Sequence, residues 1–148
     1  MRLAVDTNVL AYAEGVNGGA AKKIALDLIA RLPEDSTFIP VQALGELFHV
    51  LVRKASRPPE RARAAILSWQ DAFPVIETSP AVLFAAADLA TQHRLSIWDS
   101  VILSAAAAAG CRLLLSEDLQ EGFIWSGVTV TNPFAKPRHE LLTEVLGN

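Results

Sequence analysis

The fold is decided near the start of the chain, in the stretch Arg2-Leu3-Ala4-Val5-Asp6-Thr7-Asn8-Val9-Leu10. Apolar residues run without interruption from Leu3 to Val5, which predicts a short strand buried on both faces. The apolar run ends at Asp6, and we expect a first helix from Thr7 onward. A buried strand that leads directly into a helix is typical of a parallel sheet covered by helices.

The rest of the chain repeats this alternation of short apolar strands and helices. Further strands are expected at 37–39, 75–76, 113–115 and 128–130, and helices at 20–32, 41–55, 60–73, 80–94 and 98–109. We therefore predict an α/β fold, a three-layer α/β/α sandwich around a mostly parallel central sheet. In such sheets a functional site lies at the carboxyl ends of the strands.

Length and composition limit the classes of protein that need to be considered. The chain has 148 residues, 51% of them hydrophobic, and a formal net charge of −3, so it can bury the core of one domain but has no overall attraction to nucleic acid or membranes. Its single cysteine excludes a disulfide framework and a cysteine-rich zinc site, which fits a reducing cytoplasm. No signal peptide or bilayer-spanning stretch is visible, so we expect a cytoplasmic location and no membrane partner.

Four acidic residues stand in apolar surroundings, where a solvated surface would not place them. They are Asp6 at the end of the first strand, Glu46 within an apolar helical stripe, Asp99 before Val101-Ile102-Leu103, and Asp118 shortly after the strand at 113–115. A buried carboxylate costs several kcal/mol unless it is paired or binds a metal ion. No Lys or Arg is adjacent to these acids in sequence, so we expect them to form a cation-binding cluster.

A structural explanation exists for three of the four acids. Asp6, Asp99 and Asp118 each fit the N-cap of a helix, where the side chain accepts a hydrogen bond from a backbone N–H. Glu46 has no such alternative, because it lies in the middle of its predicted helix between apolar neighbours. The cation-binding hypothesis accounts for all four acids together.

Oxygen-only ligands indicate which ions would suit such a cluster. Mg²⁺ and Mn²⁺ prefer carboxylates and keep several waters, so a few acidic side chains in an open cleft suffice. One or two such ions can polarise a phosphodiester and lower the pKa of a water nucleophile. Phosphodiester hydrolysis of this kind needs no histidine or cysteine nucleophile.

Four motifs, in this order along the chain, resemble the PIN domain and, within it, the VapC toxins of VapBC toxin–antitoxin systems. They are Asp6-Thr7-Asn8-Val9-Leu10 after the first strand, Glu46 in a helix after Pro40, Trp98-Asp99 at the start of a helix, and Leu115-Ser116-Glu117-Asp118 after a strand. The resemblance covers roughly residues 2–134. It implies a PIN-like nuclease domain at 1–134, followed by a tail at 135–148 that is either docked or flexible.

The resemblance also implies an activity, a metal and partners. It implies an Mg²⁺-dependent endoribonuclease, with Mn²⁺ able to substitute, that cleaves RNA by a metal-activated water and acts as a toxin. It further implies a homodimer and a VapB-like antitoxin that blocks the site. Asp6, Glu46 and Asp99 match the three core acids of the family, and either Asp118 or its neighbour Glu117 matches a more variable fourth. Thr7, Asn8 and Ser116 match supporting polar positions.

Two other functions remain open at this point. One is a different metal-dependent phosphohydrolase, such as a haloacid-dehalogenase-like enzyme, although that chemistry requires a second aspartate where Asn8 stands. The other is a non-catalytic interaction module that kept the fold. The RNA, its cleavage site and the antitoxin cannot be named from the sequence.

A basic cluster could contact RNA beside the acidic site. It comprises Arg53, Lys54, Arg57 and Arg61, with Arg63 close by and only Glu60 opposing. Such side chains would contact phosphates and offset the overall negative charge locally. The alternative is the solvated side of a helical hairpin. The tryptophans, Trp98 among them, are expected in the core.

Overall fold

The computed structural model describes residues 1–147. Its strands are β1 (Leu3–Val5), β2 (Thr37–Pro40), β3 (Val75–Ile76), β4 (Leu113–Leu115), β5 (Ile124–Trp125) and β6 (Val128–Thr131). Its helices are α1 (Thr7–Ala13), α2 (Gly19–Arg31), α3 (Val41–Arg53), α4 (Pro59–Ala72), α5 (Pro80–His93), α6 (Ile97–Ala108) and α7 (Glu140–Leu146), with a short 3₁₀ turn η1 (Glu34–Ser36).

The strands form one sheet in the order β3-β2-β1-β4-β6-β5. All neighbouring pairs are parallel except β5 with β6. β1 lies in the interior of the sheet, with Leu3 in register with Thr37 of β2 on one side and with Leu113 of β4 on the other. Because these strands are parallel, the segments that follow β1, β2 and β4 leave the same edge of the sheet, as the sequence predicts.

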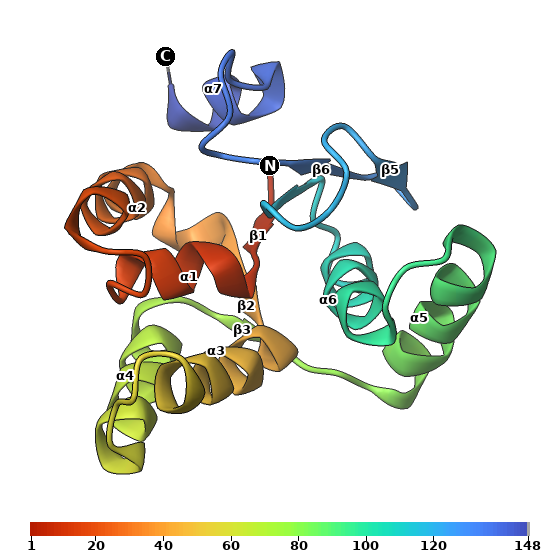
Figure 1. Ribbon diagram of the computed structural model, residues 1–148. Helices are drawn as coiled ribbons and strands as arrows, with labels where there is room; N and C mark the ends of the chain where they lie inside the picture. The colour runs from red at the N-terminus through yellow and green to blue at the C-terminus, as the bar shows by residue number, and fades with distance from the viewer. Residues whose placement is uncertain (148) are drawn as a thin grey trace.

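Helices cover both faces of the sheet, which confirms the predicted three-layer α/β/α architecture. Figure 1 shows α1 to α4 gathered on one side of the strands and α5 with α6 on the other. Every residue of β1 and β4 is buried, which explains why these strands are apolar without alternation. Within residues 1–147, no helix is long and apolar enough to cross a membrane.

The predicted boundaries hold to within a few residues, and three elements, η1, β5 and α7, were not expected. The edge strand β5 contains only Ile124 and Trp125, and the exposed Ile124 carries no signal of a buried strand. The segment after Phe134, whose docking the sequence left open, contains α7, and its Leu142 is completely buried. His139 caps this helix, because its Nδ1 accepts a hydrogen bond from the Leu141 N–H at 3.0 Å.

One polar contact ties the end of α1 to the α3–α4 hairpin. The Arg57 guanidinium pairs with the Glu14 carboxylate at 2.7 Å and also donates to the Glu14 carbonyl oxygen at 3.0 Å. The second carboxylate oxygen of Glu14 accepts the indole N–H of Trp69 at 2.9 Å. Both carboxylate oxygens of Glu14 and both terminal nitrogens of Arg57 therefore have partners, which helps a partly buried ion pair to be tolerated.

Candidate active site

Asp6 lies at the carboxyl end of β1 and caps α1. Its backbone N–H donates to the Leu115 carbonyl at 3.0 Å, which extends the pairing of β1 with β4 by one residue. Its Oδ1 accepts the Thr7 N–H at 2.6 Å, and its Oδ2 accepts the Ser116 hydroxyl at 2.7 Å. Asp6 therefore has the N-cap role that the sequence allowed, and Ser116, directly after β4, holds its second oxygen.

This cap alone does not satisfy a buried charge. Burial raises the pKa of Asp6 from its usual value of 3.8 to about 7, although the hydrogen bonds from Ser116 and Thr7 oppose the change. The negative charges of Asp99 and Asp118 raise the pKa further. The protein therefore keeps a carboxylate where its ionised form is disfavoured, as expected where a cation completes the site.

Glu46 projects from the second turn of α3 toward the same region. Burial is the main cause that raises its pKa, Asp99 and Asp118 raise it further, and a hydrogen bond with Gln42 lowers it. Its Oε2 atom is buried and has no hydrogen-bond partner among residues 1–147. A buried carboxylate oxygen without a donor is costly, so this atom is positioned to receive a ligand.

Asp99 lies in the first turn of α6 and is not its N-cap. That position belongs to Ser96, whose Oγ accepts the Asp99 N–H at 3.1 Å. The Asp99 side chain is partly buried, and its pKa is raised mainly by burial and also by the charge of Asp118. The neighbouring Trp98 is 55% exposed, so the prediction that it is a core residue is wrong. The reason is that this side of the first turn of α6 faces solvent.

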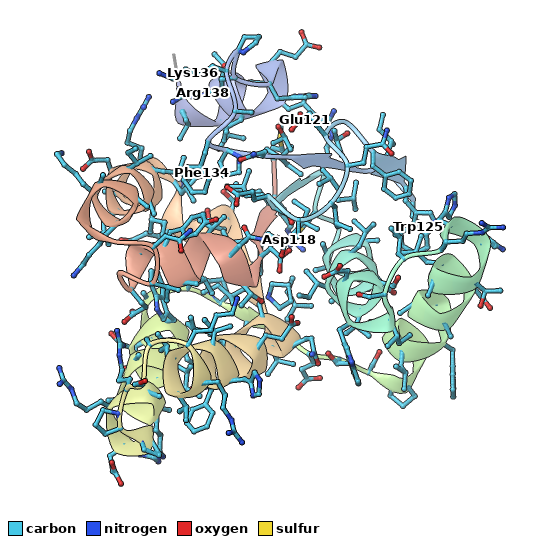
Figure 2. All side chains as sticks on the ribbon, viewed as in Figure 1. Asp118, Glu121, Trp125, Phe134, Lys136 and Arg138 are labelled. Atoms are coloured by element: carbon cyan, nitrogen blue, oxygen red, sulfur yellow. The ribbon has the colours of Figure 1, made fainter. Side chains whose placement is uncertain are left out.

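Asp118 follows β4 and, contrary to the N-cap alternative, begins no helix. Its backbone N–H donates to the Ser116 hydroxyl at 3.2 Å, so Ser116 bonds to both Asp6 and Asp118. Figure 2 shows Asp118 between α1 and α6. The neighbouring Glu117 has a different environment, since its carboxylate accepts the hydroxyl of Tyr12.

A polar cleft of about 240 Å³ opens between α1 and α3. Glu46 and Asp118 line it together with Asn8, whereas Glu117 does not. The Oδ1 of Asn8 accepts the Glu117 N–H at 3.2 Å, which connects α1 to the segment after β4. Among the two neighbouring acids, Asp118 is therefore the one that faces the cleft.

The predicted acids lie near enough to one another for their charges to interact, but they do not form one tight group. Asp99 and Asp118 each raise the pKa of both Asp6 and Glu46. No three His, Cys, Asp or Glu side chains of residues 1–147 lie close enough to one another to form a ready-made metal site. The acids therefore surround a common region from four separate elements without meeting at a single point.

The basic cluster separates into two kinds of residue. Arg57 is partly buried and paired with Glu14, so its charge is already used within the protein. Arg53, Lys54 and Arg61 are exposed. Lys54 also lines the acidic cleft, on the same wall as Glu46.

Sequence reasoning missed Tyr12 and Asn17, which line the cleft as well. Tyr12 follows Asn8 by four residues on α1, so both lie on the same face of this helix. That spacing was the available signal. Asn17 lies in the loop between α1 and α2, where no periodicity indicates which way a side chain points.

A parallel sheet with carboxylates at the ends of its central strands is typical of metal-dependent nucleases, and comparison of the sequence with protein families identifies the family. The family model of the PIN domain matches residues 3–121, and the chain belongs to this family. No curated protein matches the chain in sequence.

Solved structures of VapC toxins and their complexes share the fold. VapC20 from Mycobacterium tuberculosis, described as a sarcin–ricin loop cleaving toxin, has a TM-score of 0.66 at 21% identity, covering 78% of this chain and 89% of that one. A toxin–antitoxin complex from Klebsiella pneumoniae has a TM-score of 0.66 at 21% identity, covering 90% and 98%. VapBC2 from Rickettsia felis, bound to a DNA fragment from its promoter, has a TM-score of 0.64 at 19% identity, covering 88% and 97%.

The raised pKa of Asp6 makes a prediction about stability without added metal. The folded state binds the proton more tightly than the unfolded state, so this group lowers the free energy of unfolding as the pH rises from about 4 to about 7. Asp6→Asn removes the effect. We expect the variant to be more stable than the wild type at pH 8, by on the order of 4 kcal/mol at most, and much closer to it at pH 4.

Urea unfolding in EDTA at the two pH values measures this difference. Asp35→Asn, which changes an exposed acid in η1, serves as the control and should leave the stability unchanged. A stability difference between wild type and Asp6→Asn that does not depend on pH would contradict the proposed burial of charge.

Proposed function

We propose that this protein is a metal-dependent endoribonuclease of the VapC type that acts as the toxin of a toxin–antitoxin system. The observation that carries the proposal is the set of four carboxylates that surround one end of the parallel sheet, where the charges of Asp99 and Asp118 raise the pKa of both Asp6 and Glu46. They come from β1, α3, α6 and the segment after β4. Membership of the PIN domain family supports the same activity.

The residues fit a hard divalent cation. All four candidate ligands, Asp6, Glu46, Asp99 and Asp118, offer carboxylate oxygens, and Glu46 Oε2 has no other partner among residues 1–147. These ligands suit Mg²⁺, with Mn²⁺ as a substitute, better than metals that prefer nitrogen or sulfur. When bound, such an ion would polarise the scissile phosphate and lower the pKa of the attacking water. Asp118 is the fourth ligand in this proposal, because Glu117 is turned away toward Tyr12.

The protein's own groups orient the site. The Ser116 hydroxyl and the Thr7 N–H each donate to one oxygen of Asp6, and these two hydrogen bonds hold the carboxylate in one orientation. Asn8 supports the site through the backbone of Glu117. Lys54, at the rim of the cleft, is placed to contact a phosphate of the bound strand.

RNA in a single strand or a loop is the proposed substrate. An open cleft of this size admits a flexible strand whose phosphates are accessible, whereas a duplex presents a wide and rigid surface. VapC20 of Mycobacterium tuberculosis, which shares this fold, is described as a sarcin–ricin loop cleaving toxin.

The proposed partners are an antitoxin and a second copy of the chain. The structures from Klebsiella pneumoniae and Rickettsia felis contain a toxin together with its antitoxin. An arginine or lysine of an antitoxin could occupy the acidic cleft and pair with Glu46 or Asp118, which line it, in place of a metal ion. Such a system would act in the cytoplasm, where its RNA targets are.

Carboxylate substitutions test the activity. Asp6→Asn and Asp99→Asn should reduce cleavage of mixed single-stranded RNA by at least about a hundredfold while the fold is retained, because each removes a negative ligand. EDTA should stop wild-type cleavage, and added Mn²⁺ should restore it. Cleavage is followed on denaturing gels and the fold by circular dichroism, with Asp35→Asn as a charge-matched control.

Cleavage that persists in EDTA would exclude a metal mechanism. A well-folded protein that binds an antitoxin but cleaves no RNA with Mg²⁺ or Mn²⁺ would favour a non-catalytic interaction module instead.

The two kinds of basic residue should respond differently to substitution. Lys54→Ala and Arg61→Ala should weaken binding of a non-cleavable RNA and reduce the slope of log affinity against log salt by about one unit in total for the pair. Arg57→Ala should instead lower the free energy of unfolding by about 2 kcal/mol, because it leaves the Glu14 carboxylate without its cation. Fluorescence anisotropy at several salt concentrations and urea unfolding measure the two effects. A larger loss of affinity for Arg57→Ala than for Lys54→Ala would reverse this assignment.

Growth arrest tests the biological part of the proposal. Expression of the wild type alone should arrest growth, whereas Asp6→Asn should be harmless, and a gene next to the toxin gene should relieve the arrest. Colony counts after induction give the result. Equal toxicity of wild type and Asp6→Asn would show that toxicity does not depend on the carboxylate site.

A further inference from the structure

A second pocket adjoins the acidic cleft. Tyr12 and Asn17 line both, so they form the wall between them. The second pocket has a volume of about 250 Å³ and is completed by Ala21 and Ile24 of α2, by Glu117 and by Phe134. Figure 2 shows Phe134 on the side of α1 that faces α2, away from Asp118.

The pocket has one apolar side and one hydrogen-bonding side. The rings of Tyr12 and Phe134 lie 5.4 Å apart at an angle of 57°, and Ile24 beside them is 57% exposed. On the other side, the Glu117 carboxylate accepts the Tyr12 hydroxyl, and the Glu117 N–H is held by Asn8 Oδ1 at 3.2 Å. Glu117 is therefore a fixed acceptor at the margin of an aromatic surface.

This combination indicates the chemistry of the occupant. A purely apolar side chain would remove water from the Glu117 carboxylate without replacing its hydrogen bonds, which is costly. A planar heteroaromatic ring avoids that cost, because its face packs on the apolar side while N–H groups on its edge donate to the carboxylate. Nucleobases have this character, and the wall shared with the acidic cleft places the pocket next to the site proposed for the phosphodiester.

We propose that this pocket is a nucleobase subsite, which holds the base of a nucleotide adjoining the scissile phosphate and prefers guanine. The preference follows from Glu117, which can only accept hydrogen bonds when ionised, whereas guanine presents a ring N–H and an amino group side by side. Tyr12 and Ile24 contact the face of the base. The inference rests on the proposed ribonuclease function and adds a specificity-determining site to it.

Cleavage of a random-sequence RNA pool, followed by sequencing of the new ends, tests the subsite in the active enzyme. Guanine should be enriched at one fixed position beside the cut. In a matched oligonucleotide, inosine at that position, which lacks the amino group, should lower kcat/KM by about tenfold, mainly through KM. Glu117→Gln should abolish the difference between guanosine and inosine.

Two exposed apolar residues of α2 provide a matched pair of variants. Ile24→Ser changes the pocket, and Leu26→Ser changes a residue on the same helix that does not line it. Ile24→Ser should reduce the guanine enrichment, and Leu26→Ser should leave it intact. A base preference that is absent, that favours another base, or that survives both Glu117→Gln and Ile24→Ser overturns the subsite. The groove would then be assigned to a protein partner.

Direct binding separates this inference from the proposed function. Guanosine 5′-monophosphate should shift the NMR signal of the Ile24 methyl groups, whereas ribose 5-phosphate should not, and Glu117→Gln should weaken the nucleotide's binding. If these results are obtained with a protein that cleaves no RNA, the subsite stands and the nuclease proposal fails. If RNA is cleaved and the nucleotide leaves Ile24 unaffected, the nuclease proposal stands and the subsite fails.

Discussion

The structure depends on one buried carboxylate, that of Asp6, at the carboxyl end of the central strands. Asp6 ends β1, an interior strand of the sheet, and is held by the Ser116 hydroxyl from the segment after β4 and by the first N–H of α1. These contacts align β1, β4 and α1 with one another. They do not make the charged form favourable, because burial raises the pKa of Asp6 to about 7. The fold therefore accepts a local cost in stability at the point where its candidate chemistry lies, as is common at functional sites.

The remaining acids add to this cost and do not relieve it. Asp99 and Asp118 raise the pKa of Asp6, and both act on Glu46 as well. The partly buried Arg57 of the α3–α4 hairpin pairs with Glu14 and does not line the acidic cleft. Among the residues that line the cleft, the exposed Lys54 is the one cation, and none of the four carboxylates has an ion pair among residues 1–147, so they stay available to a cation from outside.

Much of this arrangement could be predicted because it is encoded locally. The uninterrupted apolar run from Leu3 to Val5 indicates a strand covered on both faces, and the structure buries all of it. Glu46 stood out because an acid within an apolar stripe has no local explanation. What could not be predicted depends on distant partners: the pairing of Arg57 with a residue 43 positions earlier, and the different surroundings of Glu117 and Asp118, of which Glu117 bonds to Tyr12. Strand β5 is too short to give a periodic signal.

The interior position of β1 also has a consequence for the order in which the protein is made. Asp6 is synthesised well before its hydrogen-bond donor Ser116, which is 110 positions later in the chain. The strand beside which β1 must lie, β4, is equally late. While the chain grows on the ribosome, the four carboxylates therefore cannot come together until β4 and the segment after it have emerged. Fragments that end before β4 lack the pairing that defines the site, so the full set of acids comes together only after β4 and the segment that follows it have been synthesised.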